Sequence, residues 1–218
     1  MADLPAHAKG DPSRDCPLCP RLVVLRAETR SREPTWHNAP VPTFGSARAE
    51  LLIVGLAPGL RGANRTGRPF TGDFAGDLLY ATMLEFGFAT GEYRARADDG
   101  LTLVNAAITN AVRCVPPQNK PTPAEVATCR PFLAGRIDTT PGLRALLALG
   151  RVAHESVLRA YATPLSRAPF GHGKRHELAP GGPTLFDSYH CSRYNTNTRV
   201  LTTDMFRAVF ADIRAFLG

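Results

Sequence analysis

The sequence predicts an α/β fold, a single domain with a four-stranded parallel central sheet flanked by helices. Short apolar segments typical of buried strands alternate four times with stretches of helical spacing. Strands that are each followed by a helix build a parallel sheet covered on both faces. The chain has 218 residues, 44% of them hydrophobic, which is enough to bury the core of one domain.

Four segments are predicted to be the strands. The first is an apolar run ending in glycine, AELLIVG at Ala49–Gly55, and it is typical of a strand buried on both faces. The other three are Leu101–Ile108, Arg144–Leu149 and Thr184–Tyr189. Ligands bind at the carboxyl ends of such strands, and polar, glycine-rich stretches follow three of the four.

Four helices are predicted between and after these strands. Thr122-Pro-Ala-Glu125 has the pattern of a capping box with proline in the first turn, and it opens a helix that extends to about Gly135. The other three are Asp73–Phe88, Arg151–Tyr161 and Thr203–Phe216. Two stretches are predicted to be irregular: an amino-terminal segment, residues 1–42 of the single domain 1–218, and a long surface loop over Thr163–Gly182, rich in Gly, Pro, His and basic residues.

The net charge of +7 suits a polyanionic partner, because each neutralised phosphate releases a counterion. A solvated basic surface explains the same charge equally well. No apolar run approaches the roughly 20 residues that span a bilayer. The amino terminus, MADLPAHAKGDPSRD, lacks the apolar segment of a secretory signal. We therefore expect a soluble cytoplasmic protein.

Four of the five cysteines form a pattern typical of a metal centre. Cys16 and Cys19 make a CxxC pair, and Cys114 and Cys129 can supply two further thiolates. Zinc and a 4Fe–4S cluster both accept four thiolates, and the wide second pair favours the cluster. Four reduced cysteines without a metal are the alternative. The fifth cysteine, Cys191, lies outside the pattern.

The loop after the first strand has the composition of a ligand-binding loop. Gly55-Leu-Ala-Pro-Gly59 lets the backbone approach a ligand closely, so Gly55, Ala57 and Gly59 are expected to line a substrate site. It has neither the dinucleotide-binding nor the Walker spacing of glycines. Phosphate contacts are expected from the three arginines that follow, Arg61, Arg65 and Arg68.

Three motifs, in this order, resemble the uracil-DNA glycosylase superfamily. They are GLAPGLRGANRTGRPFTGD at 55–73, ITNAVRCVPP at 108–117 and SYHCSRYNT at 188–196. The branch they resemble most is the fifth family, called type B, and the similarity extends from Cys16 onward. The resemblance implies a four-stranded parallel sheet and a structural 4Fe–4S cluster on Cys16, Cys19, Cys114 and Cys129.

Three residues in these motifs suit the removal of a base from DNA. An enzyme of this kind flips the nucleotide out of the stack, and Phe70 offers a ring on which the base can stack. Asn110 carries both a donor and an acceptor for the edge of uracil. His190 can donate a hydrogen bond to the base as negative charge develops on it. Without the resemblance, each has an ordinary structural explanation.

A carboxylate is needed to position water or to stabilise the positive charge on the sugar. Better-known branches of the superfamily place one just after the first strand, where this chain has Ala57. Asp73 is the first carboxylate available, and Asp77, one helical turn later, is its competitor. We predict Asp73, His190 and Asn110 as the catalytic residues.

The segment after His190 is predicted to wedge into the duplex and hold its phosphates. Relatives often have proline directly after this histidine, where this chain has Cys191. The predicted DNA contacts here are Ser192, Arg193, Tyr194 and Asn195.

The predicted activity is hydrolysis of the N-glycosidic bond of uracil, and of deaminated bases such as hypoxanthine and xanthine, by a monomer that initiates base excision repair. Neither lysine in a plausible loop, Lys120 or Lys174, lies in a motif, so no lyase activity is expected. The alternatives are a fourth-family enzyme with narrow uracil specificity, a catalytically silent DNA-binding protein with a zinc site, and a redox protein.

Overall fold

The structure is a computed structural model that describes residues 10–218. The first nine residues of the segment inspected for a secretory signal lie outside this range, so that prediction rests on the sequence. Within residues 10–218, no helix is both long and apolar enough to cross a membrane.

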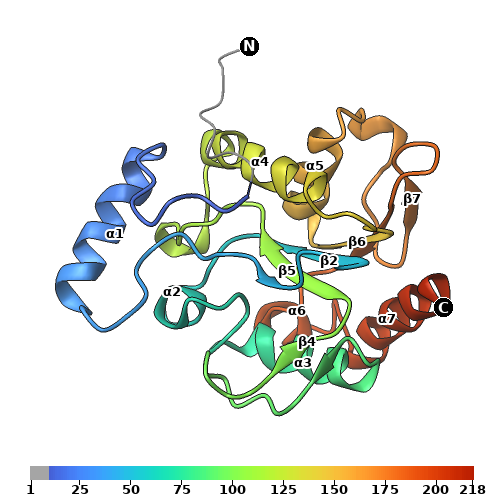
Figure 1. Ribbon diagram of the computed structural model, residues 1–218, viewed down its shortest axis with the longest axis horizontal. Coiled ribbons are helices and arrows are strands. Elements are labelled where there is room, and N and C mark those ends of the chain that lie inside the picture. Colours follow the sequence, from blue (N-terminus) through green and yellow to red (C-terminus); the bar gives the residue numbers. More distant parts are fainter. Residues whose placement is uncertain (1–9) are drawn as a thin grey trace.

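A mostly parallel sheet of six strands forms the centre of the protein (Figure 1). Its four inner strands are parallel to one another, as predicted, and a short antiparallel strand is added at each edge. The edge strands have two and three residues, too few for a periodic signal in the sequence. In spatial order the strands are β1 (Phe44–Gly45), β5 (Ala106–Asn110), β2 (Leu51–Gly55), β6 (Ala145–Leu149), β8 (Thr184–Ser188) and β7 (Arg175–Glu177).

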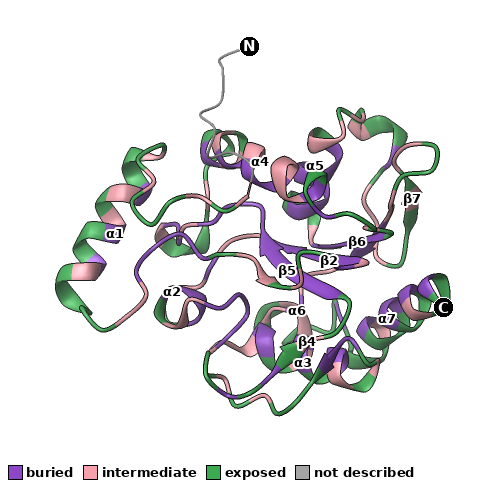
Figure 2. Cartoon of the chain, in the orientation of Figure 1, coloured by how far each residue is buried: buried purple, intermediate pink, exposed green. Residues whose placement is uncertain are grey.

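Helices cover both faces of the sheet, as the alternating pattern predicts (Figure 1). On one face, α3 (Phe74–Glu85) and α7 (Thr203–Leu217) enclose a core that includes Ile53. On the other, α4 (Pro123–Asp138) and α5 (Arg151–Ala160) enclose a core that includes Leu52. Successive strand residues thus enter opposite cores, and the inner strands are buried along most of their length (Figure 2).

The start of α4 forms the capping box that its sequence predicts. The Thr122 hydroxyl accepts a hydrogen bond from the Glu125 backbone N–H at 3.2 Å, and the Glu125 carboxylate accepts from the Thr122 N–H at 2.8 Å. The Glu125 carboxylate also pairs with Arg21 at 2.7 Å. This pair ties the amino-terminal part of the chain to the body of the protein.

Residues before Pro42 are not wholly irregular, which corrects one prediction. Helix α1 covers Pro20–Arg32, with proline in its first turn, and it buries Leu22, Arg26 and Thr29 on one side. These three positions are four and three residues apart, the spacing of one helix face. The pattern is hard to see in the sequence because one of the buried residues is an arginine.

Two further boundaries differ from the prediction. The strand predicted at 101–108 divides into β4 (Thr102–Leu103), which pairs with β3 (Ala89–Thr90), and β5. Asn105, between them, has φ +49° and interrupts the extended backbone. The loop predicted at 163–182 contains the edge strand β7 and a short 3₁₀ turn at Leu165–Arg167.

The direction in which the chain adds strands reverses between β2 and β6. The chain leaves β2 for β5 on one side, and leaves β6 for β8 on the other. Such a reversal of strand order opens a crevice at the carboxyl ends of the strands. The loops that carry the three motifs follow β2, β5 and β8, so the fold brings them to this edge.

Candidate active site

Gly55 lies against the side chains of Asn110 and Phe70. It ends β2 and is in register with Asn110, which ends β5. A methyl group at Gly55 would lie 2.4 Å from the Asn110 Oδ1 atom and 2.6 Å from Cζ of Phe70. Only glycine leaves room for both side chains, so the amide and the aromatic ring converge where the first strand ends.

Phe70 is held in an unfavourable backbone conformation, with φ +53°. The hydroxyl of Tyr80 donates to the Pro69 carbonyl at 2.6 Å, and that of Tyr93 donates to the Phe70 carbonyl at 3.3 Å. The Phe70 ring stacks near the His190 ring, with 6.0 Å between centroids and 29° between planes. These contacts fix the backbone at Phe70, so the position of its ring does not depend on a ligand.

Two polar side chains at this edge, those of His190 and Asn110, lack hydrogen-bond partners among residues 10–218. Nδ1 of His190 is buried without a hydrogen bond, and within residues 10–218 we find no hydrogen bond to Nε2 of that ring or to the Asn110 amide. Burial lowers the pKa of His190 to about 4, so the imidazole is neutral at physiological pH. An unpartnered amide and a neutral imidazole beside an aromatic ring are suited to bind a planar polar ligand.

Asp73 caps helix α3 and faces the loop that follows β2. Its carboxylate accepts from the Gly76 N–H at 3.1 Å. Oδ2 of Asp73 lies close to Gly59 and Gly62, 3.2 Å and 2.6 Å from where a Cβ atom would stand on each. Burial raises the pKa of Asp73, the Gly76 N–H opposes the rise, and the charge of Asp77 adds to it. Asp77 itself is exposed.

The residues after His190, which are predicted to wedge into the duplex, form a short helix, α6 (Arg193–Asn197). The Ser192 hydroxyl accepts from the Asn195 N–H at 3.3 Å, and the Asn195 amide donates to the His190 carbonyl at 2.8 Å. The Arg193 guanidinium lies 5.3 Å from the Phe74 ring centroid, and Tyr194 is 75% exposed. Ser192 and Asn195 therefore brace His190, while Tyr194 projects outward.

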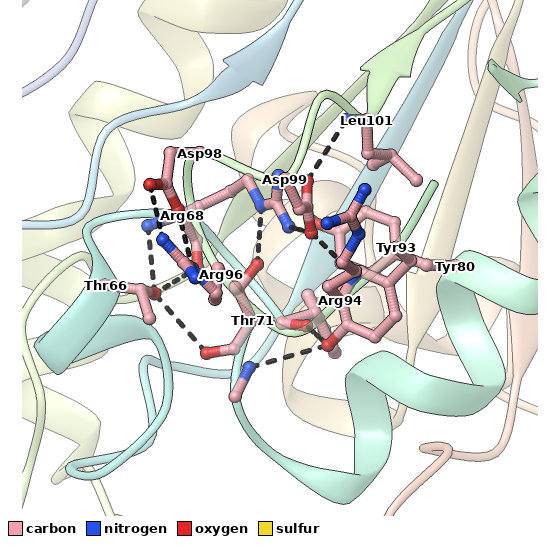
Figure 3. A network of polar contacts seen from close by, with 12 residues as sticks. Thr66, Arg68, Thr71, Tyr80, Tyr93, Arg94, Arg96, Asp98, Asp99 and Leu101 are labelled. Carbon is pink, nitrogen blue, oxygen red and sulfur yellow. Dashed lines mark hydrogen bonds and ion pairs between the residues drawn. The ribbon is translucent and has the colours of Figure 1, made fainter. Parts of the chain in front are cut away.

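Arg68 is not a surface residue, which contradicts its prediction as a phosphate contact. Its guanidinium pairs with both oxygens of Asp99, at 2.8 and 2.7 Å, and it is 4% exposed (Figure 3). Nε also donates to the Thr71 hydroxyl at 2.7 Å. The Arg68 guanidinium holds the pKa of the Asp99 carboxyl well below its usual range. Because this bidentate pair is buried, Arg68 is not accessible to DNA, and it instead fixes the backbone that carries Phe70.

Replacing Arg68 with alanine is expected to lower the free energy of unfolding by about 3–5 kcal/mol, because the Asp99 carboxylate is left buried and unpaired. Arg61→Ala is the matched control, since Arg61 is exposed, and it should change stability by less than about 0.5 kcal/mol. Urea denaturation of both variants measures the difference. Equal stabilities would contradict the structural role of the pair.

The other residues predicted in the first loop differ in exposure and in the groups that they contact. Arg61 and Arg65 are exposed. Gly59 lies against the Asp73 carboxylate. Ala57 packs against the apolar cluster around the cysteines. The structure thus brings Gly55, Gly59, Phe70, Asp73, Asn110 and His190 to one sheet edge.

Cys16, Cys19, Cys114 and Cys129 line a single small cavity, although they come from three parts of the chain. None of the five cysteines forms a disulfide in the structure. The backbone N–H of Arg113 donates to Cys129 Sγ at 3.3 Å, and the guanidinium of Arg26 points to Cys114 Sγ at 3.9 Å. Cys191 lies elsewhere, buried with its thiol directed at the Ala75 carbonyl at 3.4 Å.

The donor set in this cavity fits a thiolate-bound metal group. Burial raises the pKa of Cys19 to about 11 and that of Cys114 to about 12, and it raises the pKa of Cys129 as well. Buried thiols become thiolates when a metal supplies positive charge. The N–H groups directed at two of the sulfur atoms are the outer contacts that stabilise charged sulfur ligands.

A polar cluster next to His190 was not predicted from the sequence. His172 accepts a hydrogen bond from the Tyr189 N–H at 3.2 Å, and Asp187 bonds His154 at 2.7 Å and His176 at 3.0 Å. The only signal in the sequence is a run of two histidines and two glycines, FGHGKRH at 170–176, within the stretch predicted to be a surface loop.

Comparison with known proteins identifies the family to which the chain belongs. The model of the uracil DNA glycosylase superfamily matches residues 42–214. A type-5 uracil-DNA glycosylase of Thermus thermophilus is 44% identical over 209 residues, or 93% of this chain and 94% of that protein. A type-5 enzyme of Mycobacterium bovis is 42% identical over 93% of this chain and 78% of its own. One from Pyrobaculum aerophilum is 36% identical over 94% and 90%.

The chain belongs to the uracil DNA glycosylase superfamily. Within the superfamily it is a member of type 5, since the type-5 relatives are 36–44% identical over more than nine-tenths of the chain. A type-4 enzyme of Sulfurisphaera tokodaii is only 29% identical, over 78% of the chain. Both assignments agree with the motifs read from the sequence.

Proposed function

We propose that this protein is a monofunctional glycosylase that hydrolyses the N-glycosidic bond of uracil in DNA. The observation that carries the proposal is the neutral His190 ring, whose buried Nδ1 has no hydrogen-bond partner within residues 10–218, beside the Phe70 ring, which converges with the Asn110 amide at Gly55. Buried polar groups in proteins are nearly always hydrogen-bonded, so a group without a partner indicates a missing ligand.

The pocket supplies what a flipped uracil requires. The base stacks on Phe70, and the Asn110 amide accepts from the ring N–H while donating to a carbonyl oxygen. His190 donates to a base oxygen as the bond to the sugar breaks and negative charge develops on the base. This interaction is stronger in the transition state than in the ground state, so it accelerates the reaction.

Asp73 serves the sugar side of the reaction. A carboxylate near the cation-like sugar stabilises its charge and orients the attacking water. The contacts of Asp73 with Gly59, Gly62 and the α3 amino terminus fix that carboxylate on the loop after β2. The charge balance is simple: the base leaves as an anion, water adds to the sugar, and the water proton is released.

The DNA is held by groups around the pocket mouth. Arg61, Arg65 and Arg193 contact phosphates, Tyr194 enters the stack, and Ser192 and Asn195 support the helix that carries it. The protein acts as a monomer on DNA in the cytoplasm of a bacterium or archaeon, and it initiates base excision repair.

The four cysteines hold a structural 4Fe–4S cluster, with zinc as the alternative occupant. The cluster joins the segment before α1 to the loop after β5 and to α4, and it takes no part in the chemistry. Protein purified without oxygen is expected to be brown and to contain about four iron atoms per chain. Cys114→Ser should lose the iron and melt earlier than Cys191→Ser, its control outside the cavity. A colourless protein with one zinc would establish the alternative.

The substrate range extends to hypoxanthine and xanthine, because the pocket has few fixed polar groups to reject other bases and Ala57 replaces an early carboxylate. End-labelled duplexes with one uracil, hypoxanthine or xanthine test both proposals. We expect base release from each, with the strand intact until alkali is added. Release of uracil alone would indicate the narrow specificity of the fourth family. Scission without alkali would contradict the monofunctional mechanism, and no release from any duplex would indicate a silent DNA-binding protein.

A further inference from the structure

The end of the strand that leads to His190 is supported from the side by the segment Phe170–His176. The Gly173 N–H donates to the Asp187 carbonyl at 2.8 Å, and the Asp187 N–H donates to the Lys174 carbonyl at 3.0 Å. The Gly171 N–H donates to the Asp187 carboxylate at 3.3 Å. These contacts continue the antiparallel pairing of β7 with β8, so the segment is fixed against the last residues of β8.

The Asp187 side chain anchors this segment from below. It is completely buried, and its two oxygens bond Nδ1 of His154 at 2.7 Å and Nε2 of His176 at 3.0 Å. Nε2 of His154 bonds the Ala168 carbonyl at 2.9 Å, just before the segment begins. Both carboxylate oxygens and both His154 nitrogens are therefore occupied, which leaves the segment little freedom to shift along β8.

His172 occupies the position where this segment meets the catalytic motif. Its Nδ1 accepts a hydrogen bond from the Tyr189 backbone N–H at 3.2 Å. A backbone amide can only donate, so Nδ1 carries the lone pair and the ring is not protonated there. The His172 ring also stacks on the Tyr189 ring, with 5.1 Å between centroids and 24° between planes. Burial lowers the pKa of His172, which keeps Nδ1 an acceptor at neutral pH.

We propose that His172 is a positioning residue for base excision, which holds the Tyr189 amide through Nδ1 and so sets the direction in which His190 enters the pocket. The inference rests on the proposed role of His190. The Tyr189 N–H belongs to the peptide unit between Ser188 and Tyr189, one unit before the peptide bond to His190, so a shift of this unit displaces the backbone from which the catalytic ring extends. On the other side, the side-chain amide of Asn195 donates a hydrogen bond to the His190 carbonyl at 2.8 Å. A displacement of about 1 Å can reduce catalysis about 100-fold.

Two substitutions separate the hydrogen bond from the stacking. His172→Asn places an amide oxygen near the position of Nδ1 but removes the ring, whereas His172→Phe keeps a ring on Tyr189 but removes the acceptor. In single-turnover assays on a uracil duplex, we expect the Asn variant to stay within about threefold of wild type and the Phe variant to lose about 10- to 100-fold. Both should bind abasic-site DNA as tightly as wild type, because the DNA contacts are untouched.

The reverse order of rates, or an equal loss in both variants, would overturn the proposal, since the ring or the whole residue would then matter rather than its acceptor. Should a variant fail to fold, the ¹⁵N spectrum of the wild-type protein decides: an unprotonated Nδ1 of His172 coupled to the Tyr189 amide is expected, and a protonated Nδ1 would overturn it. A wild-type protein inactive on uracil would refute the proposed function instead. The two failures are therefore distinguishable.

Discussion

His190→Ala is expected to lower the single-turnover rate of uracil release by about 10²- to 10³-fold, the usual effect of removing one donor that stabilises developing charge. Affinity for uracil-containing duplex should change little, because the hydrogen bond strengthens only as the bond to the sugar breaks. Rapid-quench measurement of base release, together with a binding titration, separates the two quantities. The fold should tolerate the change, because the His190 ring makes no protein hydrogen bond within residues 10–218.

The neutral state of His190 also predicts how the rate of base release depends on pH. Its pKa is lowered to about 4, so the ring stays neutral from about pH 5 to pH 8 and contributes no inflection to the rate there. His190→Gln, which retains an N–H donor, should keep more activity than His190→Ala. A rate for His190→Ala within threefold of wild type would place the donor elsewhere.

Asp73→Asn is expected to lower the same rate by about 10²- to 10⁴-fold, the range for loss of a positioned acid or base. Asparagine caps helices as well as aspartate, so the amino terminus of α3 remains satisfied. Asp77→Asn is the matched control, an exposed carboxylate one turn along the same helix, and it should be nearly as active as wild type.

The raised pKa of Asp73 fixes the sign of two pH effects. The rate of the wild type should fall on acidification through the Asp73 pKa, at a higher pH than for an ordinary carboxyl group, and the residual rate of Asp73→Asn should lack this fall. A pKa raised by folding stabilises the protein only at low pH, and that contribution is lost as the pH rises through the folded pKa. At neutral pH the Asn variant should therefore unfold no earlier than wild type. Urea denaturation at acidic and neutral pH checks this.

The parts of the fold with long periodic patterns could be predicted from the sequence. Each of the four inner strands overlaps a predicted segment, and the capping box at Thr122 marks the start of α4 where expected. The edge strands β1 and β7 and helix α1 were not predicted. The strands are too short for a pattern, and α1 buries a charged residue, Arg26, on its inner face.

The candidate site shows the same division. Phe70, Asn110 and His190 follow strands that end at the same sheet edge, so local order along the chain was sufficient to associate them. Arg68 was misjudged because its partner Asp99 is 31 residues away, and a buried ion pair of that kind leaves no mark on local sequence. His172 was missed for a similar reason, since its partner is a backbone amide 17 residues away, just after β8.

The most direct test of the proposed division of roles is a side-by-side measurement of single-turnover uracil release, on one duplex, by wild type, His190→Ala, Asp73→Asn and Asp77→Asn. We expect wild type and Asp77→Asn to release uracil, and we expect His190→Ala and Asp73→Asn to lose most of this rate without losing DNA binding. An Asp73→Asn variant as active as wild type would contradict this division of roles, because Asp73 would then only cap a helix and another group would direct the water.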